Sequence, residues 1–131
     1  MVALDTNVLL RYLIDDDRAQ RHRARSAMDD LSAADESGFV PDVVLVELAW
    51  VLRSAYRADR RTVLTALAAI KEARHLVFES HERFEQALAA FAAGKGDFSD
   101  CLIRERALEQ GCEAVITFDR SLLGEDGFVA P

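Results

Sequence analysis

Short apolar runs alternate with segments of helical periodicity along the whole chain. The apolar runs cover Val2 to Leu4, Phe39 to Pro41, Leu76 to Glu79, Ala114 to Phe118 and Phe128 to Ala130. The helical segments cover residues 7–14, 17–37, 43–52, 59–70, 81–93 and 98–110. Strands separated by helices predict a parallel sheet with crossover connections of one hand. We expect an α/β protein, a single three-layer α/β/α domain over residues 1–131 with a mostly parallel central sheet.

Length and composition narrow the class of protein. A chain of 131 residues has the usual size of one domain, and no apolar run approaches the roughly 20 residues of a membrane span. The start, MVALDTNVLLRYL, lacks the basic leader of a secretory signal. Cys101 and Cys112 form no CxxC pair, which favours two free thiols in a reducing compartment. We expect a cytoplasmic protein without a membrane anchor.

One carboxylate stands inside an otherwise apolar helical segment, VVLVELAWVL, as Glu47. Its neighbours one helical turn away are all apolar. A capping box does not explain it, because the expected N-cap is Asp42 and the N3 position is then Leu45. Either Glu47 has a charged partner or ligand, or it lies on a thin exposed stripe of a half-buried helix.

Four further aspartates stand where ligands bind in α/β proteins or where helices start. Asp5 and Asp119 each follow an apolar strand, and ligands lie beyond the carboxyl ends of such strands. Each could instead cap the turn or helix that follows it. In the segment GDFSD, Asp97 is placed to be the N-cap of the following helix. Asp100 lies one turn inside that helix, and we assign it a chemical role in the site instead of a capping role.

Four carboxylates in one crevice would repel one another unless a cation offset their charge. Hard oxygen ligands select Mg²⁺ or Mn²⁺. The three histidines and two cysteines lack the spacing of a zinc site. These residues predict a magnesium or manganese centre.

The basic residues are mainly arginines in two clusters, although the net charge is −7. Clusters of this kind are commonly solvated helix faces, but arginines beside a metal groove would bind phosphate. From the second cluster, Arg53 and Arg57 are candidate substrate-binding residues. The clusters comprise Arg18, Arg21, Arg23 and Arg25, and Arg53, Arg57, Arg60 and Arg61.

Four segments in order resemble the PIN-domain ribonucleases, and within that group the VapC toxins of bacterial type II toxin–antitoxin pairs. They are ALDTNVLLRYL, FVPDVVLVELAWVLR, GDFSDCLIRERALEQGC and VITFDRSLL, and they span nearly the whole chain. Each segment alone is weak evidence for the resemblance, but the order and spacing of the four segments together are specific to this family. The resemblance implies a PIN-like fold.

The resemblance also implies a set of site residues. By it, the acidic quartet is Asp5, Glu47, Asp100 and Asp119, which would be both catalytic and metal-binding, and Thr6 and Thr117 support the site. The implied protein is a Mg²⁺-dependent endoribonuclease, with Mn²⁺ as a possible substitute. It would act as a toxin, form a homodimer, and be neutralised by a VapB-like antitoxin.

Other protein classes fit less well. A phosphorylation-switch receiver would need a lysine after a late strand, and neither Lys71 nor Lys95 is so placed. A phosphatase of the haloacid dehalogenase type would need a second acid at Asn7. A non-catalytic RNA-binding PIN-like domain remains open. The sequence leaves undetermined the target RNA, the cut sequence, the metal used in cells and the stoichiometry of any antitoxin complex.

Overall fold

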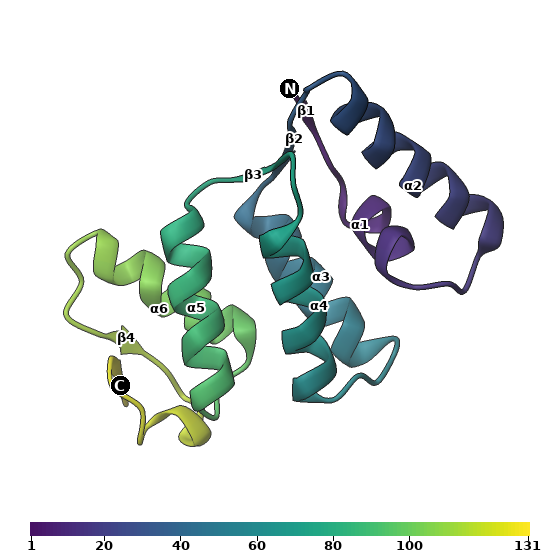
Figure 1. Ribbon diagram of the computed structural model, residues 1–131. Coiled ribbons are helices and arrows are strands. Elements are labelled where there is room, and N and C mark those ends of the chain that lie inside the picture. The colour runs from purple at the N-terminus through teal and green to yellow at the C-terminus, as the bar shows by residue number, and fades with distance from the viewer. The chain divides into compact units, whose positions relative to one another are not determined.

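The computed structural model describes residues 1–131 and divides into two compact units, Met1–His81 and Glu82–Pro131 (Figure 1). The first unit contains a three-stranded parallel sheet in the order β1-β2-β3. Gly38 allows β2 to pass close to its neighbours, because a Cβ at this position would lie 2.9 Å from Leu4 Cδ1 and 3.2 Å from Leu31 Cδ1. The strands are β1 (Val2–Ala3), β2 (Gly38–Val40) and β3 (Leu76–Phe78).

Four helices complete the first unit, with α1 packed against α2 and α3, and α3 packed against α4. Their buried leucines, valines and isoleucine form the core of the unit. Three of the four helices start at an aspartate whose side chain accepts a hydrogen bond from the first turn. The helices are α1 (Thr6–Leu13), α2 (Arg18–Ala33), α3 (Asp42–Ser54) and α4 (Arg60–Glu72).

The second unit is built on three aromatic rings and a short parallel strand pair. Phe98 packs edge-on against Phe84 and Phe91, with ring centroids 5.8 and 6.2 Å apart. Strands β4 and β5 pair in parallel, with Val115 opposite Phe128. The elements are α5 (His81–Ala93), α6 (Phe98–Glu109), β4 (Val115–Ile116), the 3₁₀ turn η1 (Arg120–Leu122) and β5 (Phe128–Val129).

The predicted α/β class with parallel strands is confirmed, since every strand pair is parallel. That the whole chain is one domain remains a prediction. No helix has the length and apolar character needed to cross a membrane.

Two predicted boundaries are wrong for local reasons. The helix expected over 17–37 ends at Ala33, and Asp35 then adopts a left-handed backbone with φ of 53°. The expected N-cap Asp42 is instead the first residue of α3, and Pro41 takes the cap position. The Asp42 backbone N–H donates to Glu79 Oε2 at 3.1 Å, so a carboxylate beyond β3 satisfies this helix start.

Candidate functional site

Asp5 lies between β1 and α1 and is the N-cap of α1. Its backbone is extended, and its Oδ1 accepts a hydrogen bond from the Thr6 N–H at 2.8 Å. The predicted capping alternative is therefore confirmed for this residue. Asp5 is exposed, and its Oδ2 makes no hydrogen bond within the protein, so one carboxylate oxygen remains available to a ligand.

Thr6 follows Asp5 and is the most unusual polar residue of this helix start. It is 2% exposed, and its Oγ1 is buried without a hydrogen-bond partner. A buried hydroxyl left unpaired costs about 1–3 kcal/mol. Thr6 is next to Asp5 in the chain, so its hydroxyl is a candidate partner for a water ligand of a cation bound by Asp5, since Mg²⁺ retains several of its waters when bound.

Glu47 lies on the exposed side of α3 and makes neither a hydrogen bond nor an ion pair. Val43 and Trp50, one turn away on either side, are 68% and 67% exposed. The helix buries its opposite face, which includes Leu45 and Leu48. Glu47 thus lies on the exposed stripe that was one of its two predicted explanations. Its role as a ligand remains a prediction.

Asp100 occupies the N3 position of α6, after Asp97 at the N-cap. The predicted capping role of Asp97 is confirmed, but Asp100 shares it, because Asp100 Oδ2 accepts from the Asp97 N–H at 3.0 Å. Burial raises the pKa of Asp100, and the charges of Asp97 and Asp119 raise it further, while the Asp97 N–H opposes the shift. The structure thus places a half-buried carboxylate beside like charges.

Asp119 follows β4 and caps η1. Its Oδ1 accepts from the Ser121 N–H at 2.9 Å and from the Ser121 hydroxyl at 2.7 Å. These bonds lower the pKa of Asp119, whereas the pKa of Asp100 is raised. The Asp119 N–H donates to Thr117 Oγ1 at 3.0 Å, so Thr117 fixes the backbone that carries the carboxylate.

Glycine permits the close packing around Asp100. A Cβ at Gly96 would lie 2.7 Å from Leu122 Cδ2 and 3.4 Å from Asp100 Cβ. The GKGDFSD break in the helical pattern therefore brings η1 close to the start of α6. That packing places Asp119 where its charge acts on Asp100.

Each unit supplies hard oxygen donors rather than a complete cage. Neither unit contains a group of three or more His, Cys, Asp or Glu side chains that could hold a metal ion. The first unit offers Asp5, with the unpartnered Thr6 hydroxyl beside it, and Glu47. The second offers Asp100 and Asp119. By donor chemistry these residues fit Mg²⁺ or Mn²⁺ rather than zinc.

Comparison with known proteins gives the family. The model of the PIN domain family matches residues 2–123. The chain belongs to the PIN-domain family. The matched region of this PIN-domain protein contains all four acids of the predicted quartet. The resemblance to PIN-domain proteins that was inferred from the order of the motifs is confirmed.

Two individual proteins are also similar to this chain. The PIN-domain protein is 28% identical over 120 residues to a VapC ribonuclease of Aquifex aeolicus (strain VF5), covering 92% of this chain and 88% of that one. Among solved structures it matches Mycobacterium tuberculosis VapC20, described as a sarcin-ricin loop cleaving toxin. That match has a TM-score of 0.43 and 20% identity, and covers 100% of this chain and 98% of the other.

The arginines proposed for substrate binding lie at the end of α3. Arg53 is in the last turn, and its charge helps to lower the pKa of Asp59, after the larger effects of the Thr62 hydrogen bonds and Arg61. Arg57 is exposed in the following loop, with a left-handed φ of 53°. Their role in substrate binding remains a prediction.

Sequence reasoning missed a second set of polar residues, on α1 and α2. Asn7, Arg11 and Arg23 line a groove between these helices. Asn7 and Arg11 stand four residues apart on α1, a spacing that places both on one helix face. The arginine cluster of α2 was recognised in the sequence, but nothing there distinguished Arg23 from its neighbours.

Proposed function

We propose that this PIN-domain protein is a Mg²⁺-dependent endoribonuclease that hydrolyses RNA phosphodiester bonds. One observation carries the proposal: Asp100 is a half-buried carboxylate whose pKa is raised by burial and by two neighbouring acids. A bound cation would offset this repulsion. Family membership and the similarity to a VapC ribonuclease support RNA as the substrate.

In this proposal Asp5, Glu47, Asp100 and Asp119 hold the metal. When bound, Mg²⁺ would activate water and offset charge on the attacking and leaving oxygens. Asp5 retains one carboxylate oxygen after capping α1, and Asp119 is held by Ser121. Glu47 carries no competing contact, so either it or Asp119 orients the attacking water.

The products follow from the nucleophile. Because water attacks instead of the substrate's 2′-OH, cleavage leaves a 5′-phosphate and a 3′-OH. An end-group assay that finds a 2′,3′-cyclic phosphate would contradict this assignment. Mn²⁺ has the same preference for oxygen ligands and is expected to replace Mg²⁺ in the assay.

We further propose that the protein is a toxin that forms a homodimer and is neutralised by a VapB-like antitoxin. The support is the similarity to a protein named VapC ribonuclease. A basic antitoxin side chain among the carboxylates would occupy the place of the metal. Co-expression with a VapB-like antitoxin should yield a complex without nuclease activity, and an uncomplexed toxin would count against this partner.

The decisive assay uses purified protein with total bacterial RNA and Mg²⁺. New 5′ ends are sequenced for the wild type, an EDTA control, Asp100→Asn and Asp59→Asn. Asp59 is a matched control, because it caps α4 by accepting from the Thr62 N–H at 2.8 Å and stands outside the quartet. Discrete cuts that vanish only with EDTA and Asp100→Asn are expected. Intact RNA from folded wild-type protein would contradict the proposal and favour a non-catalytic RNA-binding domain.

A further inference from the structure

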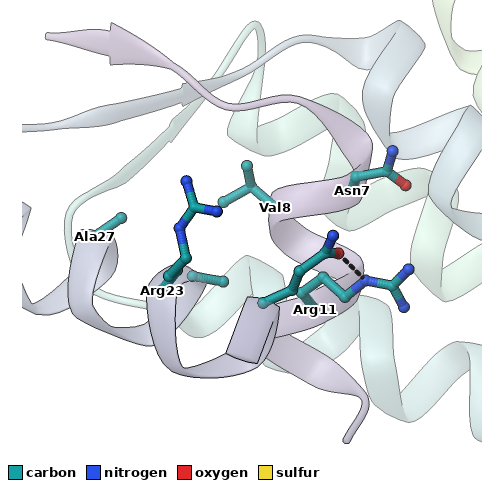
Figure 2. A pocket seen from close by; sticks show the side chains of 7 residues that line it. Asn7, Val8, Arg11, Arg23 and Ala27 are labelled. Carbon is teal, nitrogen blue, oxygen red and sulfur yellow. Dashed lines mark hydrogen bonds between the residues drawn. The ribbon is translucent and has the colours of Figure 1, made fainter. Parts of the chain in front are cut away.

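A groove of about 310 Å³ lies between α1 and α2 in the unit Met1–His81 (Figure 2). Its volume is at the lower end of the roughly 300–1,000 Å³ typical of small-ligand pockets, which suits one nucleotide better than a larger molecule. Its walls are Asn7, Val8 and Arg11 of α1, and Gln20, Arg23, Ala24 and Ala27 of α2.

The charge of this groove is opposite to that of the whole protein. No carboxylate lines it, and of its two arginines Arg11 is paired with Asp16 while Arg23 is uncompensated, on a chain with 23 acidic residues and a net charge of −7. A local positive charge on an acidic protein concentrates anions at that point. The groove is therefore suited to a ligand that carries a phosphate.

The two arginines have different surroundings. Arg11 is fixed, because its Nε donates to Gln20 Oε1 at 2.7 Å and its Nη1 donates to Asp16 Oδ1 at 2.6 Å. Arg23 is exposed and makes no ion pair or hydrogen bond. Figure 2 shows Arg23 reaching from α2 into the space that faces Val8 of α1. All the N–H donors of Arg23 are available, in a geometry that matches phosphate.

The remaining lining residues suit a base. Val8, Ala24 and Ala27 provide an apolar wall. The Asn7 side chain makes no hydrogen bond, and Gln20, whose Oε1 is engaged by Arg11, still has the donors of its amide nitrogen. RNA-binding proteins recognise unstacked bases by apolar or guanidinium contact with the ring and by hydrogen bonds to its edge.

The groove is also close to a proposed metal ligand. Asn7 follows Asp5 by two residues and lies in the first turn of the helix that Asp5 caps. With a rise of about 1.5 Å per residue, the two positions differ by roughly 3 Å along the axis of α1. If the cleaved phosphate of an RNA strand lies near Asp5, the adjoining nucleotide of that strand is close enough to enter this groove.

We propose that the α1–α2 groove binds one nucleotide of the RNA strand beside the cleaved bond. Arg23 contacts the phosphate, Asn7 and Gln20 contact the edge of the base, and Arg11 holds Gln20 in place. This inference rests on the proposed function, because it takes RNA as the substrate. It assigns part of the cut-sequence preference to Asn7 and Gln20.

Binding is tested by fluorescence anisotropy with a labelled 12-nucleotide single-stranded RNA in EDTA, where the proposed cleavage is stopped. The variants are Arg23→Gln and the matched Arg18→Gln, which removes an exposed arginine of α2 outside the groove. Arg23→Gln should weaken binding about tenfold, as expected for a lost charge-assisted hydrogen bond. It should also reduce the salt slope by about 0.7, the value for one phosphate contact on a single strand. Arg18→Gln should change the dissociation constant less than twofold.

A second variant examines the base contact. Asn7→Ala should leave the salt slope unchanged, while cut sites mapped in total RNA with Mg²⁺ lose their base preference at one position. Circular dichroism of each variant confirms that α1 and α2 remain folded. Unchanged cut-site preference in Asn7→Ala would overturn the assignment of base recognition to the groove.

The outcomes separate this inference from the proposed function. If wild type cleaves RNA but Arg23→Gln and Arg18→Gln bind equally well, the groove proposal is overturned and the nuclease stands. If wild type binds RNA without cleaving it and only Arg23→Gln binds weakly, the groove is supported and the nuclease is overturned. If wild type neither binds RNA in EDTA nor cleaves it with Mg²⁺, both are overturned, whereas cleavage without measurable binding in EDTA overturns only the groove proposal.

Discussion

The helix starts that carry Asp5 and Asp100 use a carboxylate in two different ways. At α1, Asp5 is itself the N-cap, exposed, and bonded to the next N–H at 2.8 Å. At α6, Asp97 is the N-cap, and Asp100 reaches back from N3 to accept the Asp97 N–H at 3.0 Å. The first carboxylate has a buried unpartnered hydroxyl beside it, and the second has two like charges.

This comparison shows that capping leaves one oxygen of each carboxylate free for the metal role that we propose. Each cap uses one oxygen of the side chain and orients the other, as a ligand must be oriented. Asp5 at the α1 start is exposed, whereas Asp100 at the α6 start is half-buried near other acids. We therefore expect the two sites to respond alike in catalysis and differently in stability.

The largest expected effect is the loss of cleavage in Asp5→Asn and Asp100→Asn. Asparagine can still accept the capping hydrogen bonds but brings no negative charge to a cation. RNA cleavage, measured as kcat/KM, should fall by more than the roughly 10–100-fold that follows loss of a residue supporting a ligand.

Asp59→Asn is the control for this comparison, because it changes a capping aspartate that has no proposed metal role. Its kcat/KM should stay within twofold of wild type. A similar loss in all three variants would show that the caps, and not the metal, control activity.

The next effect concerns Thr6, which distinguishes the α1 start. Thr6→Val replaces a buried hydroxyl that has no protein partner with a methyl group of the same shape. Activity should fall about 10–100-fold if the hydroxyl supports the metal. Unfolding of the metal-free protein in urea should show unchanged or slightly increased stability.

Thr6→Ser retains the hydroxyl and should keep most of the activity. Wild-type cleavage by Thr6→Val, measured across a Mg²⁺ titration, would remove Thr6 from the site. A large loss of stability in Thr6→Val would mean instead that the hydroxyl has a structural partner.

A pH effect of intermediate size should come from the α6 start. Because the pKa of Asp100 is raised by burial and then by Asp97 and Asp119, this carboxyl stays protonated at pH values where an ordinary aspartate is ionised. Metal binding needs the ionised form, so cleavage should fall as pH drops through this raised pKa. Excess Mg²⁺ should move the acid limb of the kcat/KM profile to lower pH. An acid limb independent of Mg²⁺ would contradict metal binding by Asp100.

The smallest expected effect is on the stability of the metal-free protein. A carboxyl whose folded-state pKa is raised stabilises the fold when protonated, and this contribution is lost as pH rises through that pKa. At neutral pH, Asp100→Asn should therefore be as stable as wild type or more stable, by less than about 1 kcal/mol. Mg²⁺ should raise the melting temperature of wild type more than that of Asp100→Asn. A destabilised Asp100→Asn would indicate a mainly structural carboxylate.

Much of the fold and of the local chemistry could be predicted from the sequence, because both depend on short-range patterns. The apolar runs locate the strands, Asp97 is predicted as an N-cap, and capping is one of the two roles predicted for Asp5. The capping role that Asp100 shares was missed. The prediction treated Asp97 as the cap and Asp100 only as a ligand, and so overlooked the hydrogen bond that Asp100 at N3 accepts from the Asp97 N–H.

Burial and packing between helices could not be predicted in the same way. Glu47 has apolar neighbours in sequence, but which of them are exposed depends on the side of α3 that packs against α1 and α4. The groove beside Arg23 depends on the packing of α2 against α1, which brings together residues with no sequence motif in common. Such features follow from tertiary contacts, which local periodicity does not specify.

The central claim is that acids from both helix starts serve one metal-dependent nuclease, and a double-mutant cycle tests it most directly. Cleavage rates are measured across a Mg²⁺ titration for wild type, Asp5→Asn, Asp100→Asn and the double variant. If both residues serve the same centre, the double variant should be no slower than the slower single variant. Independent losses that multiply, or cleavage that persists in EDTA, would contradict the account.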